Sequence, residues 1–126
     1  MIVTRSSNEL EVFAATIYAE ARGEPVMGQI WVAWVIKNRA RQNRQYWGGN
    51  TIKNVCLHNG QFECWNGINS IDMSEETRAR DLAIQIAQQV INANHDETNG
   101  CDHYNNPRKE GYPPWTNNCE IINNKN

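Results

Sequence analysis

The chain is patterned for a mainly α-helical domain with little β-structure. Across residues 10–21, and again across residues 79–91, apolar side chains recur at intervals of three and four, which gathers them on one face of a helix. Residues 30–36 form an unbroken apolar run inside a longer helix-compatible stretch. Its length and polar ends favour a buried central helix over a buried strand. We therefore expect three main helices joined by shorter elements.

Residues with known capping preferences mark the ends of the first two helices. Ser6–Glu9 has the form of a capping box, in which a serine hydroxyl and a glutamate satisfy the free amides of the first turn. Gly23 is a natural stop for this helix. Pro25 stands where a second helix would have its first position, and this helix is expected over residues 26–41.

Turn and capping signals also predict the remaining elements. Gly48-Gly49 marks a turn, and Asn50 is expected to cap a short helix over residues 51–57. Residues 58–73 have the composition of a long loop, which tends to be functional when it carries aromatic residues.

Ser74, followed by two glutamates, is the expected start of the last helix. Beyond residue 92 the chain is polar and turn-rich, with a short extended piece expected at residues 103–105.

Glu20 is the first candidate functional residue. At about 100° per residue it falls within roughly 20° of Phe13, on the flank of the apolar face of the first helix. A carboxyl there is half-buried, and partial burial favours the protonated form that a general acid needs near neutral pH. The alternative is a boundary glutamate that pairs with Arg22 or Arg39, as most charged residues remain solvated.

Length, charge and hydropathy exclude several classes of protein. The 126 residues suit one domain, which we assign to residues 1–126, and a net charge of −2 argues against a nucleic-acid partner. No apolar run approaches the ~20 residues needed to cross a bilayer, so we expect no membrane partner. The first eleven residues lack the apolar core of a secretion signal, so the chain is either a mature fragment or exported by another route.

Four cysteines allow three pairings. Local disulfides, Cys56–Cys64 and Cys101–Cys119, would each close and steady a short loop, in an oxidising environment. Free buried thiols are the alternative. Because the cysteines and histidines lack the usual spacing of zinc ligands, we expect no metal and no cofactor.

Three segments in order resemble the catalytic domain of spore cortex-lytic enzymes and related cell wall hydrolases, the SleB/CwlJ type. The match covers roughly residues 9–117, and its motifs are specific only in combination. Similar domains occur in bacterial wall-remodelling proteins and in phage lysins. The segments are Tyr18-Ala19-Glu20-Ala21-Arg22-Gly23-Glu24-Pro25 with Gly28-Gln29 and Asn38-Arg39, then Thr51–Cys56 with Gln61–Asn66, and finally His103–Pro107 with Pro114-Trp115.

The resemblance implies a compact, lysozyme-like or lytic transglycosylase-like helical domain that acts as a monomer on the glycan strands of peptidoglycan. It implies action at the cell wall, after secretion, in the periplasm or after lysis of a phage host. It assigns the catalytic glutamate to Glu20. It also suggests that a sugar groove is lined by Gln61, Phe62, Glu63, His103, Tyr104 and Asn105.

The chemistry leaves two routes open. Ordinary glycosidases use two carboxylates, whereas in lytic transglycosylases the 6-hydroxyl of the sugar attacks and one residue serves as acid and then base. Glu24 is more suited to capping or pairing, so Glu63 is the better second carboxylate, although simple exposure is its commoner state. Without a motif pair of carboxylates, we favour cleavage between N-acetylmuramic acid and N-acetylglucosamine by the transglycosylase route.

Other functions and roles remain as alternatives. A muramidase would use a second carboxylate, an N-acetylmuramoyl-L-alanine amidase would usually use zinc, and a non-catalytic module would only bind the wall. His103 is given a supporting role. Trp47, Trp65 and Trp115 lie in turn-rich regions where aromatic rings can stack on sugars, although packing beneath loops is the commoner use.

Overall fold

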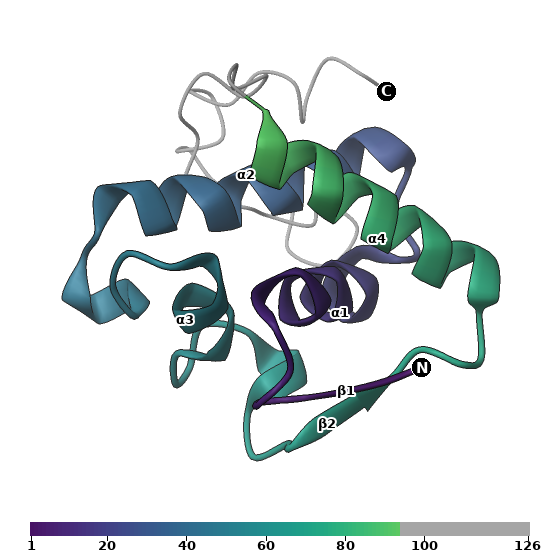
Figure 1. Cartoon of the computed structure of the whole chain (residues 1–126), viewed down its shortest axis with the longest axis horizontal. Helices are drawn as coiled ribbons and strands as arrows, with labels where there is room; N and C mark the ends of the chain where they lie inside the picture. Colours follow the sequence, from purple (N-terminus) through teal and green to yellow (C-terminus); the bar gives the residue numbers. More distant parts are fainter. Residues whose placement is uncertain (94–126) are drawn as a thin grey trace.

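The computed structural model describes residues 1–93 (Figure 1). The predicted extended piece at residues 103–105 lies outside this part of the chain, as do Cys101 and Cys119. The described elements, where η marks a single turn of 3-10 helix, are β1 (Ile2–Thr4), α1 (Glu9–Ala21), α2 (Val26–Gln42), η1 (Gln45–Trp47), α3 (Ile52–Leu57), η2 (Glu63–Trp65), β2 (Ser70–Asp72) and α4 (Thr77–Asn92).

The fold is mainly helical with a minimal sheet, as the sequence predicts. α1 lies at the centre and packs against α2, α3 and α4, which surround it in Figure 1. Most of α1 is therefore buried, which explains its nearly continuous apolar sequence. The buried residues of α1 are Val12, Phe13, Ala14, Ala15, Thr16, Ile17, Tyr18 and Ala21.

α2 and α4 complete the core as the apolar pattern predicts. Residues 31–36 of the apolar run of α2 are buried, and Trp31 and Trp34 are 2% and 1% exposed. On α4 the predicted stripe buries Ala83, Ile86, Ala87 and Val90, while the opposite face is exposed. α1, at the centre, is thus apolar on most of its sides, whereas α4, on the outside, is apolar on one face.

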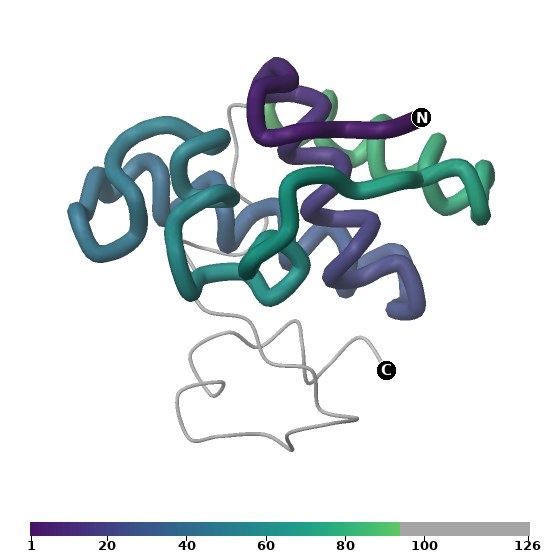
Figure 2. Tube along the Cα trace, turned by 90° about the horizontal axis from the view of Figure 1, so that it is seen from below, coloured from purple at the N-terminus to yellow at the C-terminus, as the bar shows by residue number. Residues whose placement is uncertain are grey.

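The two strands are a feature that the sequence analysis missed. β1 and β2 pair antiparallel in the register Ile2–Asp72, Val3–Ile71 and Thr4–Ser70. Figure 2 shows the N-terminal strand running beside the segment that leads into α4. Three residues are too few for an alternating pattern to be recognised. The sequence therefore predicted one continuous loop over residues 58–73.

Three predicted helix starts are wrong by one or two residues. Asn8, rather than Ser6, caps α1, because its Oδ1 accepts from the amide of Glu11 at 2.8 Å. Thr51, rather than Asn50, caps α3. The third shift is at α4, which begins at Thr77 instead of following Ser74 directly. Helix boundaries are the least certain part of a pattern-based prediction because several neighbouring residues here are good caps.

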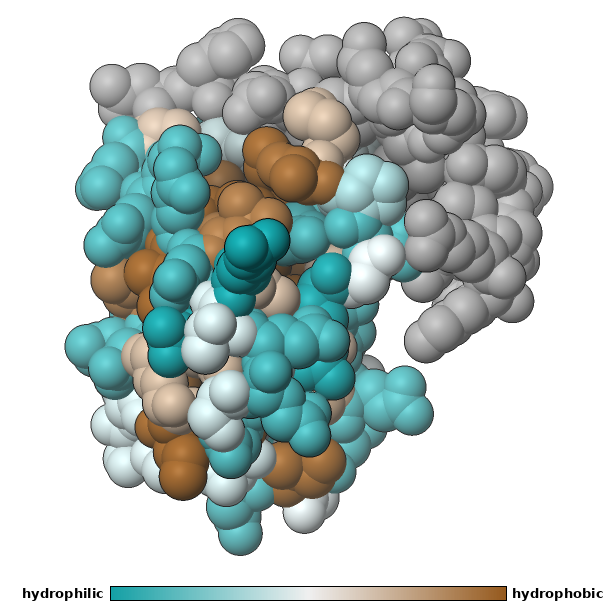
Figure 3. Space-filling model, turned by 90° about the vertical axis from the view of Figure 1, so that its right-hand side faces the viewer, coloured by the Kyte–Doolittle hydropathy of each residue, from teal (hydrophilic) through white to brown (hydrophobic). Residues whose placement is uncertain are grey.

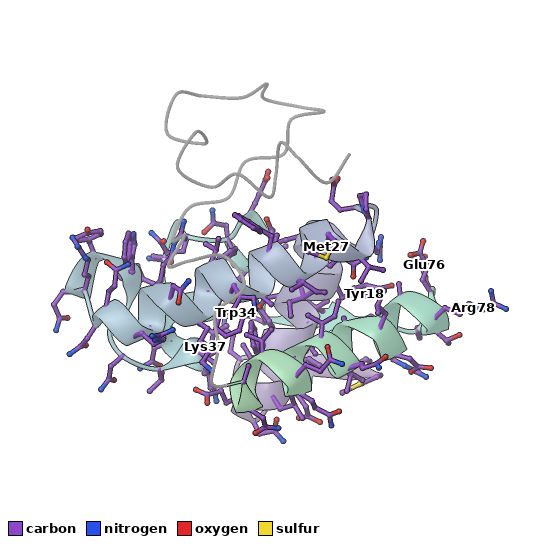
Figure 4. The ribbon with its side chains drawn as sticks, turned by 90° about the horizontal axis from the view of Figure 1, so that it is seen from above. Tyr18, Met27, Trp34, Lys37, Glu76 and Arg78 are labelled. Atoms are coloured by element: carbon purple, nitrogen blue, oxygen red, sulfur yellow. The ribbon has the colours of Figure 1, made fainter. Side chains whose placement is uncertain are left out.

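Lys37 joins α2 to the end of α4. Its ammonium group donates to the carbonyl oxygens of Val90, Ile91 and Ala93 at 2.7, 3.2 and 3.1 Å. Figure 4 shows Lys37 beside the last turn of α4. Carbonyls in the last turn of a helix lack the usual partners of the helix interior, so the lysine helps to satisfy them and complements the negative end of the helix dipole.

The surface of the described residues is mostly hydrophilic. Seen from the side where α4 begins, hydrophobic residues form only separate patches between polar ones (Figure 3). Within residues 1–93 no helix is both long and apolar enough to span a membrane.

Candidate active site

Glu20 occupies the last turn of α1 and is half-buried, as its place on the helix predicts. Its Oε2 accepts a hydrogen bond from the backbone amide of Cys64 at 3.2 Å, and the Cys64 thiol is a neighbour of the carboxylate. The carboxylate is therefore held against η2, in the loop that the sequence analysis singled out. A carboxylate fixed on one side and accessible on the other is suited to proton transfer.

A buried tryptophan anchors this loop to α1. The indole nitrogen of Trp65 donates to the hydroxyl of Thr16 at 2.9 Å, and that hydroxyl donates to the Val12 carbonyl at 2.7 Å. Trp65 is only 1% exposed, so it packs beneath the loop and is not available to stack on a sugar. Because Cys64 directly precedes Trp65, this anchor sets the position of the amide that binds Glu20.

Arg5 fastens the same loop from its other side. Its guanidinium donates to the carbonyl oxygens of Ile68, at 3.0 Å, and Trp65, and it lies 5.6 Å from the centroid of the Trp65 ring. Three contacts by one planar cation restrict the loop more than a single hydrogen bond would. Arg5 precedes α1 in the sequence, and nothing in its local pattern distinguishes it.

The predicted Cys56–Cys64 disulfide is not formed, and both cysteines are free thiols. Cys56 lies in the core, where burial raises its pKa to about 12. Burial, and then the charge of the neighbouring Glu20, raise the pKa of the Cys64 thiol well above its ordinary value. Burial therefore keeps both thiols protonated at neutral pH, with Cys64 next to Glu20 and Cys56 next to Thr16.

Gln61 and Phe62 lie together, and Arg39 of α2 links them. The guanidinium of Arg39 donates to Gln61 Oε1 at 2.9 Å and lies 5.8 Å from the centroid of Phe62. It lies 5.4 Å from the centroid of Trp47, which is 7% exposed. Trp47 therefore packs under the surface, the commoner use of such an aromatic residue. Phe62 is also buried, at 8% exposure, and Gln61 is half-buried.

Glu63 and Glu24 are the two glutamates that the sequence analysis weighed as a second carboxylate beside Glu20. Glu63 is exposed on η2, directly before Cys64. The backbone carbonyl of Glu24 accepts from Gln29 Nε2 at 3.0 Å, in the turn that separates α1 from α2. Arg22, proposed as a possible partner of Glu20, forms an ion pair with Glu76 at 3.6 Å.

His103, Tyr104 and Asn105 lie outside the described residues. Among residues 1–93, no group of three or more histidine, cysteine, aspartate or glutamate side chains could hold a metal ion. The sequence analysis did not identify Cys64 as the partner of Glu20 or Arg5 as the support of its loop. A cysteine adjacent to the predicted groove residues was the one available signal.

The chain belongs to the cell wall hydrolase family, whose model matches residues 23–125. This range includes all six predicted groove residues and begins three residues after Glu20. A segment of 34 residues is 53% identical to a spore cortex-lytic enzyme of Halalkalibacterium halodurans. The segment covers 27% of this chain and 10% of that relative. The family membership confirms the resemblance noted in the sequence.

No solved structure matches the chain significantly. The structure of the chain confirms the mainly helical class. Because no solved structure matches, the likeness to lysozyme stays a prediction.

Proposed function

We propose that this chain cleaves the glycan strand of peptidoglycan between N-acetylmuramic acid and N-acetylglucosamine, with Glu20 as the general acid and then the general base. Membership of the cell wall hydrolase family supports peptidoglycan as the substrate. The observation that carries the catalytic assignment is the hydrogen bond from the Cys64 amide to Glu20 Oε2, which fixes one oxygen of a half-buried carboxylate.

The proposed reaction uses one carboxyl group twice. Glu20 first gives its proton to the leaving glycosidic oxygen, which relieves the charge that develops as the bond breaks. The carboxylate then accepts the proton of the muramic 6-hydroxyl as that oxygen attacks the anomeric carbon. The products are a 1,6-anhydro sugar on one strand and a free 4-hydroxyl on the other, so no water is consumed. The amide of Cys64 holds the carboxylate in place through both steps.

A muramidase is the second candidate, and the position of Glu63 favours it over the remaining alternatives. Glu63 directly precedes the residue that binds Glu20 and its side chain is exposed, so a second carboxylate lies one residue away from the contact. Such a residue could activate water or stabilise the oxocarbenium-like sugar. The two candidates differ in product, because a muramidase leaves reducing N-acetylmuramic acid ends.

Replacing Glu20 with Gln tests the assignment. We expect Glu20→Gln to lower the rate of sacculus lysis by about two to four orders of magnitude while binding to sacculi is retained. The matched control is Glu75→Gln, an exposed glutamate before α4, which should lyse sacculi at the original rate. Lysis by Glu20→Gln at the rate of the unaltered protein would refute the proposal. Release of free peptides in place of sugar ends would identify an amidase instead.

A further inference from the structure

Among residues 1–93, the aromatic residues of the loops divide into buried anchors and one exposed ring. Trp47 and Trp65 are 7% and 1% exposed, whereas Tyr46 is 57% exposed. Tyr46 belongs to η1, which follows the end of α2 and lies near α3, at the left of Figure 1. A large exposed aromatic side chain that is held rigidly offers contact area to a ligand at little cost in conformational entropy.

Several contacts hold the Tyr46 ring in one orientation. Its ring meets Trp47 edge to face, with centroids 4.9 Å apart and planes at 66°. Arg44 Nη1 donates to the Tyr46 hydroxyl at 2.7 Å. Gly48, at φ +99°, closes the turn beneath, where an added Cβ would lie 2.5 Å from the Asn54 carbonyl oxygen. These contacts therefore restrict the orientation of the exposed Tyr46 ring.

Gln61 connects this ring to the candidate active site. Its Nε2 donates to the Tyr46 carbonyl oxygen at 3.4 Å, and its Oε1 accepts from Arg39 at 2.9 Å. Gln61 is three residues before Cys64, whose amide binds Glu20. The path from the Tyr46 carbonyl through the Gln61 side chain and the backbone to the Cys64 amide and Glu20 has a length of roughly 20 Å when fully extended. The Tyr46 backbone and the Glu20 carboxylate are therefore no farther apart than about this distance. A short stretch of a glycan strand can span that distance.

We propose that Tyr46 is a stacking platform for a pyranose ring of the glycan strand, a few sugars away from the bond that Glu20 cleaves. The C–H face of a sugar packs on an exposed aromatic ring, and polar groups at the rim bind its hydroxyl and N-acetyl groups. Arg44 supplies such a group beside the ring. This inference rests on the proposed function, since it takes the same glycan strand as ligand.

The test measures binding and cleavage separately. Binding is measured in the Glu20→Gln background by titration with purified sacculi and with glycan strands stripped of their peptides. We expect Tyr46→Ala to weaken both interactions by about three- to tenfold and Tyr46→Phe to weaken them less, because the stacking face remains. Ile2→Ala, which truncates an exposed apolar residue on β1, is the matched control and should bind normally.

Each result supports or overturns the platform. Unchanged affinity of Tyr46→Ala for peptide-free strands overturns it, as does a loss confined to intact sacculi, which would assign Tyr46 to the stem peptide. Thermal unfolding of each variant checks that the fold is retained. Lysis by Glu20→Gln would defeat the catalytic assignment alone, whereas normal binding by Tyr46→Ala would defeat the platform alone.

Discussion

Glu20 and Cys64 are separated by 44 residues in the sequence and meet through one hydrogen bond. The helical period was enough to place Glu20 at the boundary of a buried face, because that depends only on its neighbours in α1. Its partner could not be predicted, because the amide of Cys64 is brought to it by a loop whose path is set by Trp65 and Arg5. Trp65 could be expected to pack beneath a loop but its partner could not be predicted, and Arg5 has no local sequence signal.

Substitutions of Glu20 should separate its structural role from its chemical one. The amide oxygen of Glu20→Gln still accepts from the Cys64 amide, so its melting temperature should match that of the unaltered protein. Glu20→Ala leaves this amide without its acceptor, and we expect a loss of about 1 kcal/mol in the free energy of unfolding. Urea titrations measure both values. Equal stability of the alanine variant would show that the Cys64–Glu20 contact does not hold the loop.

The thiol of Cys56 predicts a pH dependence of stability at alkaline pH. Burial raises its pKa from 9.0 to about 12, so between these values the unfolded chain releases a proton that the folded chain keeps. Stability is then fully present below about pH 9 and falls as the pH rises, by about 1.4 kcal/mol per pH unit for a thiol of this kind. Urea titrations at about pH 8 and about pH 10 measure the slope.

Cys56→Ala is the control for that slope. It removes one titrating thiol from both states, so the decline between the two pH values should be smaller than in the unaltered protein. Identical declines would mean that Cys56 is not protonated in a buried site.

At the scale of secondary-structure elements, the cap of α1 offers a direct test. Asn8 accepts from the amide of Glu11, whereas Ser6 lies two residues earlier and is exposed. We expect Asn8→Ala to cost about 1 kcal/mol and Ser6→Ala no more than a few tenths. Chemical denaturation of the two variants compares them. A larger cost at Ser6 would support the capping box expected from the sequence.

The junction of α2 and α4 depends on Lys37. Lys37→Met keeps the aliphatic stem but leaves three carbonyl oxygens of the α4 terminus without this donor, and we expect a loss of about 1–3 kcal/mol. Lys53→Met, on the short helix α3, is the control and should be nearly neutral. Hydrogen exchange should show the loss as faster opening of the last turn of α4. Protection unchanged by Lys37→Met would contradict this role.

Elements differ in how far the sequence could predict them. Two of the three long helices follow from apolar periodicity and the second from a long apolar run, and all three are present, although the starts of α1 and α4 are shifted. The pairing of β1 with β2 depends on contact between residues 2–4 and 70–72, which no local pattern encodes. The disulfide expected from the spacing of Cys56 and Cys64 is not formed, because spacing along the chain does not determine whether two thiols bond in the folded chain.

At the scale of the whole molecule, the helical packing brings the end of α1, the loop after α3 and the segment after α2 together. Gln61 and Phe62 therefore lie with Arg39, while Cys64 lies against Glu20. The sequence resemblance predicted which loop belongs to the candidate site. It did not predict which residues of that loop are buried and hold it in place and which are exposed to a substrate. That division depends on burial, which only the folded chain determines.

The central claim is that Glu20 cleaves a glycosidic bond without a water nucleophile. Mass spectrometry of muropeptides released from sacculi by the unaltered protein tests it most directly. We expect 1,6-anhydro-N-acetylmuramic acid ends, which Glu20→Gln should fail to produce. Reducing N-acetylmuramic acid ends that depend on Glu63 as well as Glu20 would contradict the one-carboxylate reaction.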